Sequence, residues 1–213
     1  YVAAARRQGY RSRAAFKLIE LDDRFALLAP GRRVVDLGCA PGGWCQIAAI
    51  RTDAAAGEGV AGGVAAGVAA GVAPGAAAGI VVGIDLEPTE PIRGATLLHG
   101  DFRDAQSAGA IRAALGGAAD LVLSDMAAPA TGHAATDHLR VVALAEDAFA
   151  LAATLLRPGG AFVAKVFQGG AEGALLAALK RAFAEVRHAK PAASRAESAE
   201  TYVVAKGFRG IAE

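Results

Sequence analysis

Apolar residues follow two alternating patterns along the chain. Short continuous apolar runs, which are typical of buried strands, predict strands at residues 33–38, 80–85, 96–99, 120–125 and 161–167. Apolar residues at helical spacing predict helices at residues 12–28, 44–50, 111–115, 139–156 and 175–183. Pro30-Gly31 and residues 157–160 are expected to end the helices that precede them. Strands that alternate with helices favour a mainly parallel sheet with helices on both faces.

The end of the chain departs from this alternation. Residues 186–190 and 201–206 both have strand character, and no helical pattern separates them. Two such strands predict a closing antiparallel hairpin. With the five earlier strands, this hairpin predicts a single α/β domain over residues 1–213 that is built on a mostly parallel, seven-stranded sheet.

Residues 54–79 do not fit the alternation of predicted strands and helices. They repeat a crude Val-Ala-x-Gly unit, as in Gly59-Val-Ala-Gly and Gly63-Val-Ala-Ala. The period is too short for a solenoid repeat. We interpret residues 54–79 as a low-complexity Gly/Ala/Val insertion within the domain.

Composition excludes several classes of protein. The chain has 213 residues, which is the length of one domain, and 20% of them are charged. The longest uncharged stretch, Gly59 to Ile84, is too rich in glycine to predict a membrane span. Cys39 and Cys45 match no zinc pattern, so they predict reduced side chains and no metal site. No signal peptide is visible, and we expect a cytoplasmic protein.

Charge is unevenly distributed although the net charge is only +1. Five basic residues and one acid occur in residues 1–20, and the same numbers occur in residues 180–195. Two basic clusters could form one face that binds a polyanion such as a nucleic acid. The alternative is two solvated surfaces that never meet.

A glycine-rich turn, Asp36-Leu-Gly-Cys-Ala-Pro-Gly-Gly-Trp44, joins the first predicted strand to a helix. Glycine lets the backbone pass close to a ligand, and a helix start offers free N–H groups. The turn does not match the dinucleotide-binding pattern, because Ala40 stands at the second glycine position. It is not a P-loop either, because no Lys-Ser/Thr follows.

Three acidic residues lie where the predicted strands end. An acid that binds ribose is expected about 20 residues beyond such a turn. Asp85 lies 47 residues beyond Gly38, and 21 remain once the 26 residues of 54–79 are subtracted. Asp85 is therefore the ribose candidate, with a helix cap as the alternative. Asp101 could accept a hydrogen bond from an adenine amino group, or it could be a loop or N-cap residue. Asp125 ends the fourth strand.

A nucleoside site without phosphate-binding residues suggests S-adenosylmethionine, because carboxylates suit a cofactor that is cationic at sulfur. Further motifs add a resemblance to a family. The segments that carry it are Tyr10-Arg-Ser-Arg-Ala-Ala-Phe-Lys-Leu18, Val35–Trp44, Gly100-Asp-Phe-Arg-Asp104, Ser124-Asp-Met-Ala127, Val163-Ala-Lys-Val-Phe-Gln-Gly169 and Ser194–Ala205. In this order they resemble the FtsJ/RrmJ-type (RlmE) ribosomal RNA 2′-O-ribose methyltransferases. The resemblance spans nearly the whole chain except residues 54–79.

The resemblance implies a Rossmann-like, S-adenosylmethionine-dependent methyltransferase fold. It also implies a catalytic tetrad at Lys17, Asp125, Lys165 and Glu200. Matching the family's motifs places cofactor contacts at Gly42, Trp44, Asp85, Asp101 and Asp125. One departure concerns the loop after Asp125. The family usually continues Asp-Met-Ala-Pro-Asn, whereas this chain has Asp125-Met-Ala-Ala-Pro-Ala-Thr-Gly132.

Methyl transfer to a ribose hydroxyl is an in-line displacement, so the protein must align the reactants and remove a proton. A lysine can act as the base where burial or a neighbouring cation favours its neutral form. Lys165 lies in an otherwise apolar strand and is the expected base. Lys17 would stabilise the developing alkoxide, and Glu200 and Asp125 would hold both ammonium groups.

The expected substrate is RNA rather than DNA, because the 2′-hydroxyl is the acceptor. The resemblance favours a uridine in the A loop of large-subunit ribosomal RNA. We expect this RNA to be bound within the assembled subunit, and we expect a monomeric enzyme. Another 2′-O-methyltransferase, acting on transfer RNA or an mRNA cap, stays an alternative. A ribosome-assembly factor that binds ribosomal RNA with little need for turnover is a second alternative. A small-molecule methyltransferase would share the fold but would not need two basic clusters.

Overall fold

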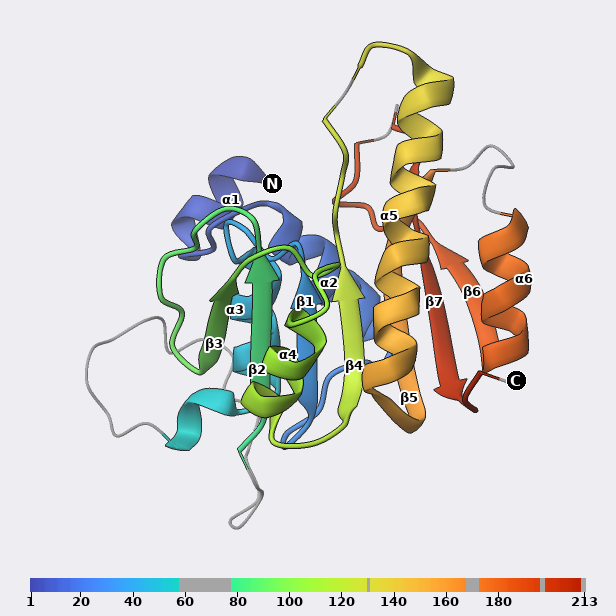
Figure 1. Ribbon diagram of the computed structural model, residues 1–213. Helices are drawn as coiled ribbons and strands as arrows, with labels where there is room; N and C mark the ends of the chain where they lie inside the picture. The colour runs from blue at the N-terminus through green and yellow to red at the C-terminus, as the bar shows by residue number, and fades with distance from the viewer. Residues whose placement is uncertain (58–77, 130, 168–172, 196–197, 212–213) are drawn as a thin grey trace.

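Runs of aliphatic residues form the strands of one seven-stranded sheet in a computed structural model of the chain. The structure describes residues 1–57, 78–129, 131–167, 173–195 and 198–211. The strands are β1 (Arg33–Leu37), β2 (Ile80–Asp85), β3 (Ala95–His99), β4 (Ala119–Ser124), β5 (Leu156–Phe167), β6 (Phe183–Ala189) and β7 (Glu200–Phe208). Their order is β3-β2-β1-β4-β5-β7-β6, and β7 runs antiparallel to both of its neighbours (Figure 1). The predicted sheet and its closing hairpin are confirmed.

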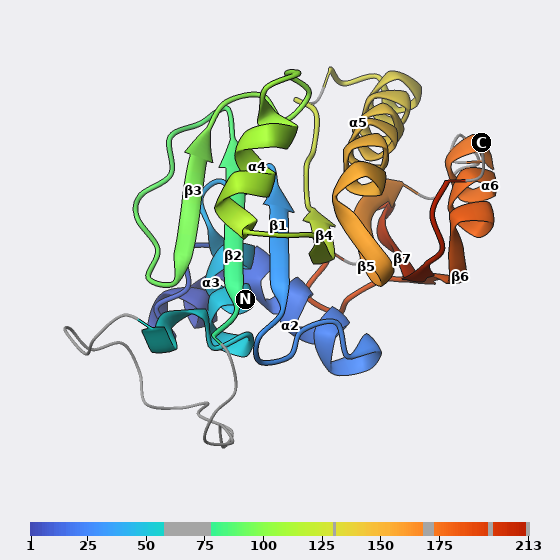
Figure 2. The ribbon, with the colours of Figure 1, turned by 60° about the horizontal axis from the view of Figure 1, so that its bottom comes forward.

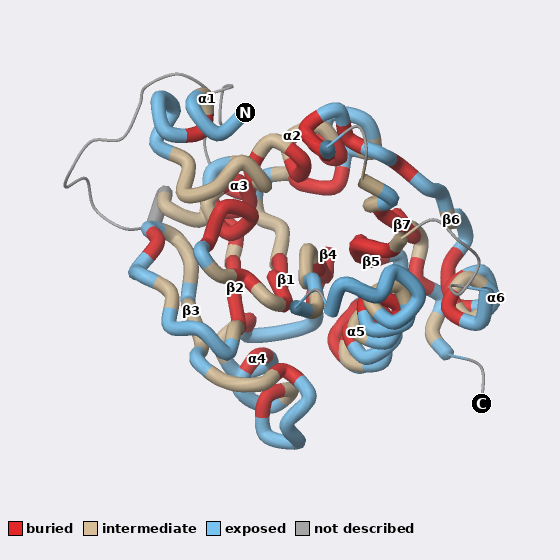
Figure 3. The backbone as a smooth tube through the Cα atoms, turned by 90° about the horizontal axis from the view of Figure 1, so that it is seen from above, coloured by how far each residue is buried: buried red, intermediate tan, exposed pale blue. Residues whose placement is uncertain are grey.

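Helices cover both faces of the sheet. They are α1 (Val2–Arg7), α2 (Ala14–Phe25), α3 (Gly43–Arg51), α4 (Ser107–Leu115), α5 (Ala134–Leu155) and α6 (Gly173–Ala182), with a short 3-10 helix η1 (Ala54–Gly57). Seen from above, α2 and α3 lie on one side of the buried strands, and α4, α5 and α6 lie on the other (Figure 3). The side chains of β5 alternate between the two apolar cores: Phe162 packs toward α5, and Val163 toward α2 and α3.

Helix α2 ends earlier than the predicted boundary at residue 28. It stops at Phe25, because Ala26 takes a left-handed conformation with φ 52° and ψ 57°. The Asp22 carboxylate then accepts the backbone N–H of Leu28 at 2.6 Å. Leu28 stays buried although it lies outside the helix. The apolar stripe in the sequence thus continues beyond the residue at which the helix ends.

Helix α5 begins at Ala134, five residues before the predicted start at residue 139. Its first turns project past the ends of the strands (Figures 1 and 2). Residues 134–138 are exposed or only half-buried, and they carry no apolar stripe that could predict a helix. The helix ends at Leu155, before residues 157–160 as expected. Strand β5 starts at Leu156 rather than at residue 161, and its pairing with β4 is irregular there.

The antiparallel direction of β7 determines which residues meet at the carboxyl edge of the sheet. Parallel strands all end at this edge, whereas β7 begins there. In the register of the pair, Glu200 lies opposite Phe167, and Tyr202 lies opposite Lys165. The sheet therefore brings the first residues of β7 beside Lys165, although they are far apart in the sequence.

Most of the predicted insertion lies outside the described residues, since 58–77 are among those not described. Its reading as an insertion stays a prediction. The flanking residues meet, because the N–H of Gly79 donates to the carbonyl oxygen of Thr52 at 2.9 Å. Within the described parts of the chain, no helix is long and apolar enough to cross a membrane.

Replacing residues 58–77 with a linker of about five Gly and Ser residues should preserve the fold. Because a shorter connection costs less closure entropy, replacing these 20 residues with about five should raise the free energy of unfolding by roughly 1 kcal/mol. Urea unfolding, followed by circular dichroism, measures this change.

A second deletion that also removes Ala54–Gly57 serves as the contrast. A Cβ placed on Gly94 would lie 2.7 Å from the backbone nitrogen of Ala55, so η1 packs closely on that loop. The longer deletion should therefore be less stable than the shorter one. Loss of cooperative unfolding in the 58–77 variant would mean that the segment belongs to the folded core.

Candidate active site

A buried ion pair joins β5 to the loop after β4. The Lys165 ammonium lies 2.8 Å from Asp125 Oδ1, and it also donates to the backbone carbonyl of Asp125 at 2.7 Å. Lys165 is only 7% exposed. Asp125 directly follows β4, so the carboxyl end of that strand aims its side chain at the neighbouring strand.

A second ion pair joins helix α2 to β7. Lys17 Nζ donates to Glu200 Oε1, and it lies 3.8 Å from Asp125 Oδ1. Lys17 is 4% exposed. Two ammonium groups and two carboxylates therefore form one cluster at the carboxyl edge of the sheet, with Asp125 between the lysines.

Glu200 is held in its ionised form within this cluster. Burial raises the pKa of its carboxyl. The hydrogen bond from Lys17 and the positive charges of Lys165 and Lys17 outweigh burial, so the net pKa is below the usual range. Glu200 therefore offers a negative charge to the lysines at neutral pH.

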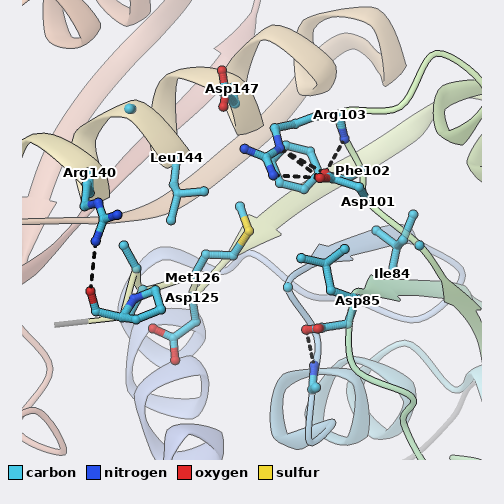
Figure 4. A pocket seen from close by; sticks show the side chains of 18 residues that line it. Ile84, Asp85, Asp101, Phe102, Arg103, Asp125, Met126, Arg140, Leu144 and Asp147 are labelled. Carbon is cyan, nitrogen blue, oxygen red and sulfur yellow. Dashed lines mark hydrogen bonds and ion pairs between the residues drawn. The ribbon is translucent and has the colours of Figure 1, made fainter. Parts of the chain in front are cut away.

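A cavity of about 660 Å³ opens beside Asp125 (Figure 4). This size is typical of sites for small molecules and cofactors. The turns after β1, β2, β3 and β4 and one side of α5 form its wall, and the lining includes Gly38, Asp85, Asp101, Phe102, Met126 and Leu144. The cavity lies at the carboxyl edge of parallel strands, where open α/β sheets bind their ligands.

Gly38 and Asp85 shape one wall of this cavity. Gly38 has φ 73°, and a Cβ there would lie 2.1 Å from Met126 Cγ, so the turn needs glycine. Asp85, the last residue of β2, accepts the backbone N–H of Ala40 at 2.8 Å and that of Glu87 at 2.8 Å. The Asp85 carboxylate thus ties the glycine turn to β2 and lines the cavity at the same time.

Comparison with protein families gives a match over residues 10–208 to the FtsJ-like methyltransferase model. The chain belongs to the FtsJ-like methyltransferase family. Among curated relatives, a protein of Granulibacter bethesdensis is 56% identical over 98% of this chain and 80% of its own length. A protein of Paramagnetospirillum magneticum is 54% identical over 100% of this chain and 80% of its own length. Both are named ribosomal RNA large subunit methyltransferase E.

Solved structures agree with the family's fold. A ribosomal RNA methyltransferase from Plasmodium falciparum is 27% identical and has a TM-score of 0.75, over 94% of this chain and all of that one. Human methyltransferase-like protein 13, solved with S-adenosylhomocysteine, has a TM-score of 0.52 at 12% identity, over 96% of this chain and 85% of that one. The predicted Rossmann-like methyltransferase fold is confirmed, and so is the predicted family.

The structure brings together the four residues of the expected tetrad, Lys17, Asp125, Lys165 and Glu200, and it places Asp85 and Asp101 in the wall of the cavity. Their chemical roles stay predictions. The geometry adds that Asp125 belongs to both groups, since it pairs with Lys165 and also lines the cavity.

Gly42 and Trp44, two expected cofactor contacts, lie farther along the glycine turn. Gly42 has φ 107°, a backbone conformation that L side chains rarely adopt, so the turn needs glycine at this position. Trp44 is buried, and its indole N–H donates to the Ala14 carbonyl at 2.8 Å. Trp44 lines a second cavity of about 280 Å³ that also includes Asp125. Neither cavity is lined by Gly42.

Two further residues contact the cluster and are not predicted from the sequence. The Tyr202 hydroxyl lies 2.5 Å from Asp125 Oδ1 and 3.0 Å from Glu200 Oε1, and Ser194 Oγ donates to Glu200 at 3.2 Å. Burial, followed by the charges of Asp125 and Glu200, raises the pKa of Tyr202 well above its usual value, so the phenol keeps its proton. The sequence contains one signal that could identify Tyr202. It follows Glu200 by two residues, so in a strand the two side chains lie on the same face of the sheet.

The two arginines before Lys17 differ in their surroundings. Arg11 donates to the carbonyl oxygens of Pro41, Glu90 and Pro91, which uses three of the five N–H groups of a guanidinium. Arg11 therefore clamps the glycine turn to the loop after β2. Arg13 instead lines the second cavity together with Asp125. Of the two, Arg13 is better placed to meet a substrate.

A buried acid lies beneath the glycine turn. Asp36 is 1% exposed and accepts a hydrogen bond from the thiol of Cys45 at 3.2 Å. Burial raises the pKa of Asp36 to about 7; the charges of Asp125 and Asp85 act in the same direction, and the bond from Cys45 opposes them. Cys45 and Cys39 are both buried, and neither forms a disulfide.

Asp36 should make the folded state less stable as pH rises. The folded protein holds this proton up to about pH 7, whereas the unfolded chain releases it near 3.8. Proton release therefore favours unfolding across the window from about pH 4 to pH 7, by up to about 4 kcal/mol at 1.4 kcal/mol per pKa unit. Asp36→Asn should remove this decline, as urea unfolding at several pH values measures.

The control variant is Asp104→Asn, which changes an exposed aspartate and should keep the decline of stability with pH. An unchanged decline in Asp36→Asn would contradict the assignment.

Proposed function

We propose that this chain transfers a methyl group from S-adenosylmethionine to a ribose 2′-hydroxyl in large-subunit ribosomal RNA. The observation that carries the proposal is the buried cluster in which Lys165 and Lys17 pair with Asp125 and Glu200, because Asp125 also lines the cavity. Such a cluster offers a base and a second positive charge beside a cofactor-sized space. Both are needed to deprotonate a hydroxyl and to stabilise its alkoxide.

S-adenosylmethionine is the cofactor that family membership indicates. The cavity fits it in size and chemistry: Asp85 would accept the ribose hydroxyls, and Asp101 the adenine amino group. Gly38 lines the cavity with backbone alone, and Asp125 supplies negative charge nearby. When bound, the cofactor supplies a methyl group on a positively charged sulfur.

The lysines then perform complementary tasks. Lys165 must first release its ammonium proton to solvent, and the neutral amine then accepts the proton of the ribose hydroxyl. The carbonyl and the carboxylate of Asp125 hold its nitrogen at the edge of the sheet. Lys17 stabilises the negative charge on the attacking oxygen, and Glu200 fixes its position. The Tyr202 hydroxyl contacts both carboxylates and keeps them in register with the lysines.

The names of the relatives support large-subunit ribosomal RNA as the substrate. Within this class we propose a uridine of the A loop, methylated in the assembled subunit by a monomeric, cytoplasmic enzyme. We also propose that Arg13, which lines the second cavity, contacts a phosphate next to the target nucleotide.

Methyl transfer from labelled S-adenosylmethionine to undermodified large subunits tests the proposal. We expect label on assembled subunits, mapped to a single uridine 2′-oxygen, and little label on free ribosomal RNA or transfer RNA. Preferred labelling of transfer RNA would favour a different 2′-O-methyltransferase. Cofactor binding without any methylation of subunits would favour an assembly factor.

Lys165→Ala should lower the single-turnover rate of methyl transfer by about 10²–10⁴-fold, the usual contribution of a general base. Lys165→Arg should not restore the rate, because a guanidinium stays protonated. The assay uses protein in saturating excess over RNA, so that weaker RNA binding by a variant cannot be mistaken for a slower chemical step. Near-normal rates in Lys165→Arg would contradict the lysine-base mechanism.

Lys206→Ala provides a matched control on the neighbouring strand. Lys206 lies opposite Ala161, far from the carboxyl edge, and donates to the carbonyl of Phe25 at 2.6 Å. Its removal should leave the single-turnover rate unchanged. Equal losses in both variants would point to a general effect of lysine removal from this part of the sheet.

A further inference from the structure

Asp101, the expected acceptor for the adenine amino group, is already engaged by another residue that lines the cavity. Arg103 Nη2 donates to Asp101 Oδ2 at 2.6 Å, and Arg103 Nε lies 3.0 Å from Oδ1 and 3.2 Å from Oδ2. The backbone N–H of Arg103 also donates to Oδ1 at 2.9 Å. One residue thus contacts both carboxylate oxygens from its main chain and its side chain (Figure 4).

The backbone of Asp101 is also fixed. Its carbonyl oxygen accepts the Ser107 hydroxyl at 2.6 Å and the Asp104 N–H at 3.1 Å. The preceding residue, Gly100, donates its N–H to the carbonyl of Asp85 at 2.8 Å. With the backbone held, Arg103 is the group that sets the orientation of the carboxylate.

The carboxylate keeps room for one more donor. A carboxylate offers about four acceptor positions. The backbone N–H and Nε of Arg103 donate to Oδ1, and Nη2 donates to Oδ2. The fourth contact, from Nε to Oδ2 at 3.2 Å, is the longer half of a hydrogen bond shared between both oxygens, so Oδ2 can accept a further donor there. Asp101 is 22% exposed, and both it and Arg103 line the large cavity. The hydrogen bond from Arg103 is also the main cause that lowers the pKa of Asp101, so the carboxylate stays an acceptor.

We infer that Arg103 is a positioning residue for cofactor recognition, which holds the Asp101 carboxylate so that it accepts the 6-amino group of adenine. The inference rests on the proposed cofactor site. Because a carboxylate repels a carbonyl oxygen, a correctly held Asp101 would select a purine with an amino group at C6 over one with an oxygen there. Arg103 would thus contribute to selectivity without contacting the base.

Calorimetric titration without RNA tests this role with two ligands, S-adenosylhomocysteine and S-inosylhomocysteine, which carries oxygen at C6. We expect the native protein to prefer the adenine ligand by about 10–100-fold. Arg103→Ala and Asp101→Asn should each reduce the preference to about threefold or less. Arg103→Ala in the Asp101→Asn background should cause no further change, because both substitutions remove the same contact.

Arg112→Ala is the matched control, because Arg112 is an exposed arginine that donates to the carbonyl of Thr154 and lines neither cavity. It should keep the preference for adenine. Thermal unfolding of each variant without ligand excludes a folding defect, which is not expected because Arg103 is 51% exposed.

An unchanged preference in Arg103→Ala, alongside a lost preference in Asp101→Asn, would overturn the role of Arg103. An unchanged preference in Asp101→Asn would overturn the inference altogether, because Asp101 would not contact the amino group. Neither result would affect the proposed function, which is judged separately by methylation of large subunits.

Discussion

The burial of two ammonium groups side by side constrains the whole carboxyl edge of the sheet. Lys17 and Lys165 are 4% and 7% exposed, and an unpaired charge at such depth would be strongly destabilising. Each lysine therefore needs its own carboxylate, which Glu200 and Asp125 supply. The Tyr202 hydroxyl contacts both carboxylates, so the five groups satisfy one another. Helix α2, the loop after β4, and strands β5 and β7 must all converge to satisfy this requirement.

The antiparallel strand provides that convergence. A parallel strand beside β5 would end at the carboxyl edge, whereas β7 begins there. Its first residue, Glu200, therefore reaches Lys17, and its third, Tyr202, pairs with Lys165 in the register. The far end of the same strand carries Lys206, which contacts α2 at the carbonyl of Phe25. The closing hairpin thus completes the site at one end of β7 and contacts the last residue of α2 at the other.

The sequence predicts the parts of the structure that depend on burial. Strands covered on both faces appear as continuous apolar runs, and Lys165 is conspicuous because it interrupts one. Tyr202 is not conspicuous, since a tyrosine in an apolar strand is also typical of a core. A count of charges predicts that Arg11 and Arg13 both belong to a surface that binds RNA. In the structure, Arg11 donates to three backbone carbonyls, whereas Arg13 lines a cavity. Hydrogen-bond partners distant in the chain leave no periodic signal, which is why the sequence misses them.

The unpredicted start of α5 bears on the loop that departs from the family pattern. The N–H and hydroxyl of Thr131 both donate to Asp137 Oδ1, at 2.8 and 2.7 Å, and Arg140 donates to the carbonyl of Pro129. The bonds from Thr131 lower the pKa of Asp137, so it stays an ionised acceptor. Asp137 and Arg140 lie in the first two turns of α5, which project past the sheet. The loop that lines the cavity after Asp125 is therefore held from the helix, and it does not need an asparagine in its own sequence to be fixed there.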